Sequence, residues 1–231
     1  MTYIVSDLHG CMEKFQKLLR EIRFTDDDVM YVLGDIVDYG EGSMDLLCDL
    51  SMRFNVISLL GDHDYRAYRL LNELNVMLRE GASAADPAVL AEMTDWIRDG
   101  GQVTMEGFKA LDDDMKEGVL EYLADLSLYE EVTVKGRKYL LLHAGIADFD
   151  AGSSLEDYMP EDFISQLADP DVAYYEGVTT VVGHLPTYQI EGADRGKIFY
   201  GEETVYMDCG AAFDEPLGCL CLDNGREYYI A

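Results

Sequence analysis

The chain has 231 residues, within the range of a single domain, and its hydrophobic content of 48% can build a sizeable core. Its charge is strongly acidic, because 17 lysines and arginines stand against 46 aspartates and glutamates, which gives a formal net charge of -29. A field of this sign repels nucleic acids and anionic membrane surfaces, so neither is expected as a partner.

Three short apolar runs near the start of the chain are predicted to be buried strands. Each run ends close to an aspartate: residues 3–5 lead to Asp7, residues 29–33 to Asp35 and residues 56–60 to Asp62. Helical patterns over residues 12–22 and 43–53 separate them, so this part of the chain is predicted to form βαβ units. Because ligands bind at the carboxyl ends of strands in open α/β sheets, we expect a site there.

The middle of the chain has helical spacing over residues 65–79, 87–99 and 112–129, and predicts a helical insertion at about 65–130 that caps the site. Strand patterns return in the second half, at residues 131–134, 139–142, 179–182, 197–200, 204–207, 217–222 and 227–230. With no repeat and no low-complexity linker, we expect one domain over residues 1–231. Its predicted class is α/β (of the α+β type), with two packed mixed β-sheets flanked by helices.

All four histidines lie in short segments rich in glycine and aspartate: Asp7-Leu8-His9-Gly10, Gly61-Asp62-His63-Asp64, His143-Ala144-Gly145 and Gly183-His184. A fifth segment, residues 34–40, carries Asp35 and Asp38. Neutral imidazole and carboxylate are ligands that hold divalent transition metals. One Asp-x-His alone is more often a turn or a helix cap, but the set as a whole indicates one metal centre.

The ordered motifs DxHG, GDxVDxG, GDHD, HAG and GHxPT resemble the phosphoprotein phosphatase branch of the calcineurin-like metallophosphoesterases. That branch includes Ser/Thr protein phosphatases and diadenosine tetraphosphatases. The resemblance runs from residue 3 to about 225, and includes a mid-chain GGxxT at residues 100–104 and a late segment at residues 208–213. It implies the metallophosphoesterase sandwich fold and hydrolysis of phosphate esters by metal-activated water.

The resemblance also implies a ligand set for two divalent ions. It assigns Asp7, His9 and Asp35 to the first ion, with Asp35 bridging to a second ion completed by Asp62, His143 and His184. Manganese is the metal expected, with iron, zinc, nickel and cobalt as alternatives. Pro186 stands where the wider family often has another histidine, which favours the phosphoprotein phosphatase branch.

Catalytic roles follow from the same resemblance. His63 matches the histidine that protonates the leaving alkoxide, and Asp64 matches the acid that orients it. A histidine with a carboxylate partner suits general-acid catalysis near neutral pH. Asp38 is expected to support the ligands rather than to bind metal.

Two positions depart from the family pattern. Tyr39 replaces an arginine that contacts the substrate phosphate, and Asp62 replaces an asparagine. A second arginine is also absent from its usual place, because residues 139–194 contain no lysine or arginine. Tyr39 can donate one hydrogen bond to phosphate but brings no charge. Arg66 is a candidate substitute, although an ordinary exposed helix position is the simpler interpretation.

Two hypotheses about function follow. The first is a dinuclear-metal-dependent phosphoesterase that acts on a phosphorylated small molecule, a nucleotide or a phosphoprotein. The second is a degenerate, weakly active or inactive member that serves as a regulatory or binding protein. The charge disfavours a nuclease-like phosphodiesterase. The cytoplasm is the expected compartment, since the sequence has no signal-peptide pattern and its five cysteines show no disulfide spacing.

Overall fold

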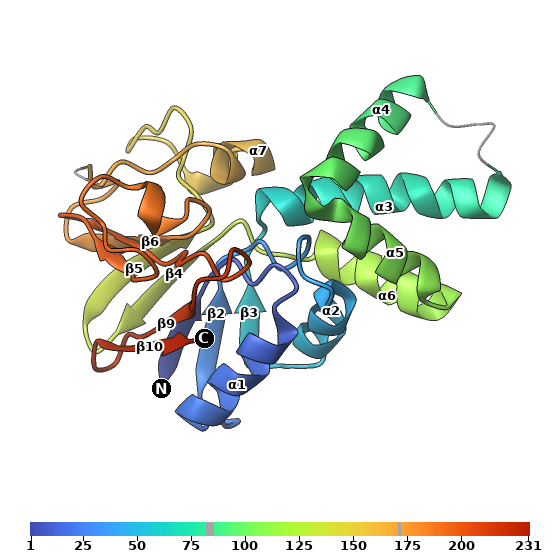
Figure 1. Cartoon of the computed structure of the whole chain (residues 1–231). Coiled ribbons are helices and arrows are strands. Elements are labelled where there is room, and N and C mark those ends of the chain that lie inside the picture. Colours follow the sequence, from blue (N-terminus) through green and yellow to red (C-terminus); the bar gives the residue numbers. More distant parts are fainter. Residues whose placement is uncertain (82–85, 171) are drawn as a thin grey trace.

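The computed structural model describes residues 1–81, 86–170 and 172–231. Two five-stranded sheets pack together and helices flank them (Figure 1). The strand order is β10-β9-β1-β2-β3 in the first sheet and β4-β5-β6-β8-β7 in the second. The predicted fold class, two packed mixed sheets with flanking helices, is confirmed.

The first sheet is built around the N-terminal strand. Its strands are β1 (Thr2–Val5), β2 (Val29–Val32), β3 (Val56–Ser58), β9 (Leu217–Cys221) and β10 (Arg226–Ile230). β1, β2 and β3 run parallel, and β9 pairs antiparallel with both β1 and β10. The helices α1 (Met12–Ile22) and α2 (Ser43–Ser51) connect the parallel strands, as the sequence pattern predicts.

The second sheet has a parallel centre and antiparallel edges. Its strands are β4 (Tyr129–Val134), β5 (Arg137–Leu142), β6 (Val178–Val182), β7 (Phe199–Tyr200) and β8 (Thr204–Tyr206). β5, β6 and β8 run parallel, while β4 and β7 pair antiparallel at the two edges. The short helix α7 (Pro160–Ile164) lies in the long connection between β5 and β6.

The core between the two sheets is apolar and fully buried. Ile4 of β1 and Leu33, which directly follows β2, cluster with Leu141 and Val181 of the second sheet, and all four have 0% exposure. A larger cluster fills the space between the sheets and the outer helices. Because the central strands are covered on both faces, they are continuous apolar runs in the sequence.

The segment between β3 and β4 is helical. It contains α3 (Asp62–Glu80), α4 (Pro87–Trp96), a kinked segment η2 (Ile97–Gly101), α5 (Gln102–Ala110) and α6 (Asp113–Ala124). The Gly100-Gly101 pair, which interrupts the helical spacing in the sequence, lies at a kink where Asp99 and Gly100 have non-helical dihedrals, and α5 follows directly. The helices stand beside the strand ends (Figure 1) and approach the histidines through residues 96–104.

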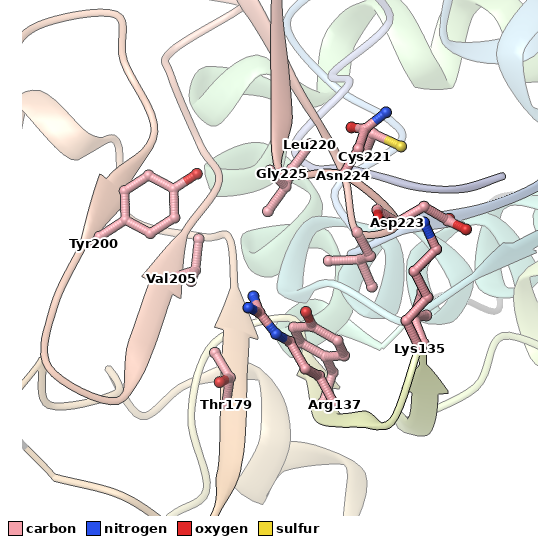
Figure 2. Close-up of a pocket in the computed structure, with 13 residues that line it drawn as sticks. Lys135, Arg137, Thr179, Tyr200, Val205, Leu220, Cys221, Asp223, Asn224 and Gly225 are labelled. Carbon is pink, nitrogen blue, oxygen red and sulfur yellow. Dashed lines mark hydrogen bonds between the residues drawn. The ribbon is translucent and has the colours of Figure 1, made fainter.

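A cavity of about 570 Å³ opens between the sheets at the end remote from the histidines. It is lined at the starts of β5 and β6 by Arg137 and Thr179, and at the β9–β10 turn by Asp223 (Figure 2). None of the residues predicted to form the metal centre lines this cavity. In the part of the chain that the structure describes, no helix is both long and apolar enough to cross a bilayer.

Candidate metal centre

The residues predicted to hold metal follow the carboxyl ends of five strands. Asp7 follows β1, Asp35 follows β2, Asp62 follows β3, His143 follows β5 and His184 follows β6. The site therefore lies where the two sheets meet, at the same end of each.

Four of these positions have left-handed backbone conformations, with φ of 51° at Asp7, 40° at His9, 53° at Asp35 and 66° at His184. Residues with a Cβ adopt this region at a cost, and such strain gathers at functional sites. The sharp turns point successive side chains into one volume just beyond the strand ends.

The first cluster of ligand atoms contains Asp35, Asp62, His143 and His184, each contributing one atom within 4.8 Å of the others. The Nε2 atom of His143 lies 3.0 Å from Oδ1 of Asp62 and 3.1 Å from Nδ1 of His184. Two imidazoles and two carboxylates at this spacing form a donor set suited to a divalent transition metal.

The second cluster contains His9, Asp35 and His63. Asp35 belongs to both clusters, and its two oxygens face different partners. Oδ2 lies 3.5 Å from Nε2 of His9, and Oδ1 lies 3.7 Å from Nε2 of His143. One carboxylate is therefore placed between two groups of donor atoms, as a bridging ligand would be.

Backbone carbonyls orient two of the imidazoles. Nδ1 of His9 lies 2.7 Å from the carbonyl oxygen of Val37, and Nδ1 of His143 lies 2.7 Å from that of Leu33. A proton on Nδ1 makes each of these hydrogen bonds and turns Nε2 towards the cluster. Burial lowers the pKa of His143, but the hydrogen bond with Asp62 and the charge of Asp7 outweigh it and raise the pKa to about 9. Burial, together with nearby His63, lowers the pKa of His9 to about 3, which favours the neutral, ligating form.

Asp7 lies outside both clusters but borders the first. Its carboxylate accepts hydrogen bonds from the hydroxyl of Ser6 and from the backbone N–H of His184, the latter at 3.1 Å. Asp7 and Asp35 are almost completely buried. Burial raises the pKa of both carboxyls well above the usual range, with Asp208 adding to the effect on Asp7 and Asp62 to that on Asp35.

The donor set fits the cations that the sequence predicts. Buried carboxylates in close proximity are costly unless a positive charge compensates them. Burial opposes ionisation of Asp62, but hydrogen bonds with His143 and His184 lower its pKa below the usual range. Divalent cations would supply the missing charge to the whole group.

His63 pairs with Asp38, whereas the family resemblance predicts Asp64 as its partner. Nδ1 of His63 lies 2.7 Å from Oδ2 of the completely buried Asp38. Thr104 donates to Oδ1 of Asp38 at 2.6 Å, and the indole N–H of Trp96 donates to Oδ2 at 2.8 Å. Burial lowers the pKa of His63, but the bond to Asp38 and the charge of Asp35 outweigh it and raise the pKa to about 9.

Asp64 organises the backbone instead. Its carboxylate accepts hydrogen bonds from the N–H groups of Ile36, Val37 and Gly61, at 2.9, 3.3 and 3.2 Å. These bonds join the start of α3 to the loop after β2. Residues adjacent in a helix point in different directions, which explains why His63 and Asp64 do not face each other.

The two residues predicted to contact substrate converge on a third. The Tyr39 ring packs edge-on against His9, with centroids 5.0 Å apart, and its hydroxyl donates to Oδ1 of Asp99 at 3.3 Å. Arg66 donates from Nη1 to Oδ2 of Asp99 at 3.0 Å. Burial and the neighbouring Asp99 raise the pKa of Tyr39 to about 12, so its hydroxyl remains a donor.

Trp96, Asp99 and Thr104 are functional candidates that the sequence reasoning missed. The GGxxT motif marks Gly100, Gly101 and Thr104 in the sequence, but nothing in it shows that the neighbouring side chains reach Asp38 and Tyr39. These contacts require the kink at η2, which a pattern of helical spacing does not specify.

Comparison with known proteins agrees with the geometry. The family model for calcineurin-like phosphoesterases matches residues 2–225. The chain belongs to this family. The family membership predicted from the sequence motifs is confirmed.

Individual relatives are similar over part of the chain or at low identity. A symmetrical bis(5'-nucleosyl)-tetraphosphatase from Salmonella paratyphi B is 40% identical over 65 residues, which are 27% of this chain and 23% of that protein. The chain thus matches about a quarter of the length of this relative. The solved structure of a putative diadenosine tetraphosphatase has a TM-score of 0.62 at 18% identity, covering 99% of this chain and 92% of the other. A metallophosphoesterase from Sphaerobacter thermophilus has a TM-score of 0.57 at 15% identity, covering 100% and 87%. These two structures support the fold.

Proposed function

We propose that the protein is a dinuclear-metal-dependent phosphoesterase. The observation that carries this proposal is the position of Asp35, whose two oxygens face His9 on one side and His143 on the other. Such a carboxylate suits a pair of divalent ions, with manganese as our choice of metal. Two bound ions would supply Lewis acidity and an activated water for attack on phosphorus.

The protein's own side chains would divide the remaining work. His9, His143 and His184 would bind the ions through neutral imidazole nitrogens, and Asp62 would add a carboxylate ligand in the first cluster. Asp7 would complete the set from the end of β1. Support comes from the burial of Asp7, His9 and His143 and from the carbonyl contacts that fix two of the rings.

His63 is proposed as the general acid. Its Nδ1 is tied to Asp38, so its Nε2 carries the proton available to a leaving alkoxide. The carboxylate stabilises the protonated ring and fixes its orientation, which is the arrangement that general-acid catalysis requires. Asp64 would act through the backbone of the loop after β2, as its three N–H contacts indicate.

The proposed substrate is a nucleotide or another phosphorylated small molecule. Similarity to a bis(5'-nucleosyl)-tetraphosphatase supports nucleotides, although it covers only 65 residues. Tyr39 and Arg66 would contact the substrate beside the metal cluster. A phosphoprotein substrate is the alternative. We also propose a cytoplasmic location, supported by the five free cysteines.

A second candidate function is a metal-binding protein with little turnover. Asp62 in place of an amide adds a negative charge to the cluster, and this charge would weaken both the Lewis acidity of the metals and their attraction for phosphate. Turnover decides between the two functions, because both predict bound metal.

The test is a substrate screen on protein supplied with manganese, run beside a metal analysis. The panel holds p-nitrophenyl phosphate, bis-p-nitrophenyl phosphate, nucleotides and diadenosine tetraphosphate. We expect hydrolysis by the wild type, with Asp35→Asn losing metal and at least about a hundredfold in rate. The matched control is Asp112→Asn, which keeps the N-cap of α6 and should behave as wild type.

Metal-loaded wild type that hydrolyses nothing in the panel would favour the binding-protein hypothesis. Wild type that takes up no divalent metal would refute both functions.

A further inference from the structure

The carboxylate of Asp99 lies between two hydrogen-bond donors. Its two carboxylate oxygens accept hydrogen bonds from two donors on different segments, the Tyr39 hydroxyl at 3.3 Å and the Arg66 guanidinium at 3.0 Å. A phosphate group also presents two oxygens to such a pair, and a guanidinium binds either kind of oxyanion. The same two donors therefore suit a phosphate group, and in the structure Asp99 accepts from both of them.

The position of Asp99 is fixed by the backbone around it. The N–H of Tyr39 donates to the carbonyl oxygen of Gly100 at 3.0 Å. A Cβ at Gly100 would lie 2.6 Å from Cδ1 of Tyr39, so the glycine backbone packs directly on the tyrosine ring. The segment is further anchored by Trp96 and Thr104, which both bond to Asp38.

This oxyanion site borders the metal centre. Arg66 lies three residues after His63 and four after Asp62 on α3, and residues at these spacings share one face of a helix. The centroid of the Tyr39 ring lies 5.0 Å from that of His9 and 5.3 Å from that of His63. A substrate whose reacting phosphate is at the metals can therefore extend a second phosphate towards Arg66.

Charge distribution makes the location distinctive. Residues 139–194, which supply His143 and His184, contain no lysine or arginine, so a cationic contact must come from elsewhere in the chain. Arg66 supplies one, with its side chain 26% exposed, and Asp99, with 54% exposure, neutralises it. An ion pair this open to water is worth little, so an incoming anion can replace one partner at low cost.

We propose that Arg66 and Tyr39 form a subsite for a second phosphate of the substrate, and that Asp99 is its internal competitor. The proposal rests on the proposed function and narrows its substrate class to polyphosphate esters, such as nucleoside triphosphates and dinucleoside polyphosphates. On binding, the phosphate takes the hydrogen bonds of Arg66 and Tyr39, and the Asp99 carboxylate moves into water.

The proposal predicts the direction in which the KM changes. If Asp99 competes with substrate, Asp99→Asn and Asp99→Ala lower the KM for diadenosine tetraphosphate by about two- to fivefold, the range expected for an exposed ion pair. If Asp99 only holds Arg66 and Tyr39 in position, the same variants raise KM. The KM for p-nitrophenyl phosphate, which has a single phosphate, should change less than that for the polyphosphate.

The matched control is Asp95→Asn. Asp95 carries the same charge one turn earlier and pairs with Arg98 at 3.5 Å, with both side chains widely exposed. It measures the effect of removing one negative charge from this region. A second control is Arg66→Gln, which should raise KM on the order of tenfold as a charged hydrogen bond is lost. In that background Asp99→Asn should bring little further gain.

A binding measurement separates this proposal from the proposed function. Calorimetry with the magnesium complex of β,γ-methylene ATP, on manganese-loaded protein, reports affinity without turnover. Tighter binding by Asp99→Asn than by Asp95→Asn supports the proposal even if no ester is hydrolysed. Equal effects of the two variants, or weaker binding by Asp99→Asn, overturn it even if the wild type is an active phosphoesterase.

Discussion

Gly100→Ala tests how tightly the helical segment between β3 and β4 holds Tyr39. Gly100 has a φ of 89°, in the left-handed region, and its backbone faces the ring of Tyr39. An added Cβ would lie 2.6 Å from Cδ1 and 2.8 Å from Cε1 of that ring. Gly136 offers a matched control, because it has a φ of 81° in the β4–β5 turn and nothing within 4 Å of its Cβ position.

The magnitudes differ because only one site is crowded. At both positions a residue with a Cβ pays roughly 1–2 kcal/mol for the left-handed backbone. Overpacking against the ring destabilises Gly100→Ala by about 1–3 kcal/mol more. A shift of the half-buried Tyr39 side chain reduces this additional destabilisation. The expected loss in the free energy of unfolding is therefore about 2–5 kcal/mol at Gly100 and about 1–2 kcal/mol at Gly136.

The assay is urea denaturation of both variants and the wild type, followed by circular dichroism. In thermal unfolding, each 1 kcal/mol corresponds to about 2–4 °C for a chain of this size. We also expect Gly100→Ala, with Tyr39 displaced, to lose more activity on a polyphosphate ester than Gly136→Ala. Equal destabilisation by the two substitutions would show that the contact between Gly100 and Tyr39 is loose, and would refute the reasoning.

Two further predictions concern the metal centre and its support. Addition of manganese to metal-free protein, at about a hundred times the dissociation constant, should raise the melting temperature by roughly 5–11 °C, since a ligand that binds only the folded state stabilises it. Asp35→Asn should lose most of this rise in melting temperature. A full rise in the variant would contradict the placement of Asp35 between the two clusters of ligand atoms. Trp96→Phe removes the N–H that donates to Asp38 and should cost about 1–3 kcal/mol in urea denaturation. A loss no larger than the scatter between repeat measurements would show that water replaces the indole.

Much of the fold can be predicted from the sequence because the relevant signals are local. Apolar runs that end at Asp7, Asp35 and His143 identify buried strands with polar residues at their carboxyl ends, and such ends meet in space. Helices α1 and α2 follow from 3.6-residue spacing in the same way. The clustering of histidines beyond these strands is then a geometric consequence of the sheet order.

Other features depend on side-chain directions that spacing does not specify. The sequence places Asp64 next to His63, yet the helix turns the two apart and the histidine contacts Asp38, 25 residues earlier. Asp99 likewise cannot be assigned from its position, because its contact with Arg66 depends on the kink at Gly100. Long-range contacts of this kind are set by tertiary packing rather than by local pattern.

The carboxylate of Asp38 connects side chains from separate helices of the molecule. It accepts hydrogen bonds from the indole of Trp96 at the end of α4 and the hydroxyl of Thr104 in α5, and contacts the imidazole of His63 at the start of α3. In the proposed function, cation binding depends on residues at the strand ends, whereas proton transfer from His63 depends on this carboxylate. On that proposal, a relative without the helical segment between β3 and β4 would still bind ions, but its general acid would lose alignment and the protein would become an ion-binding scaffold.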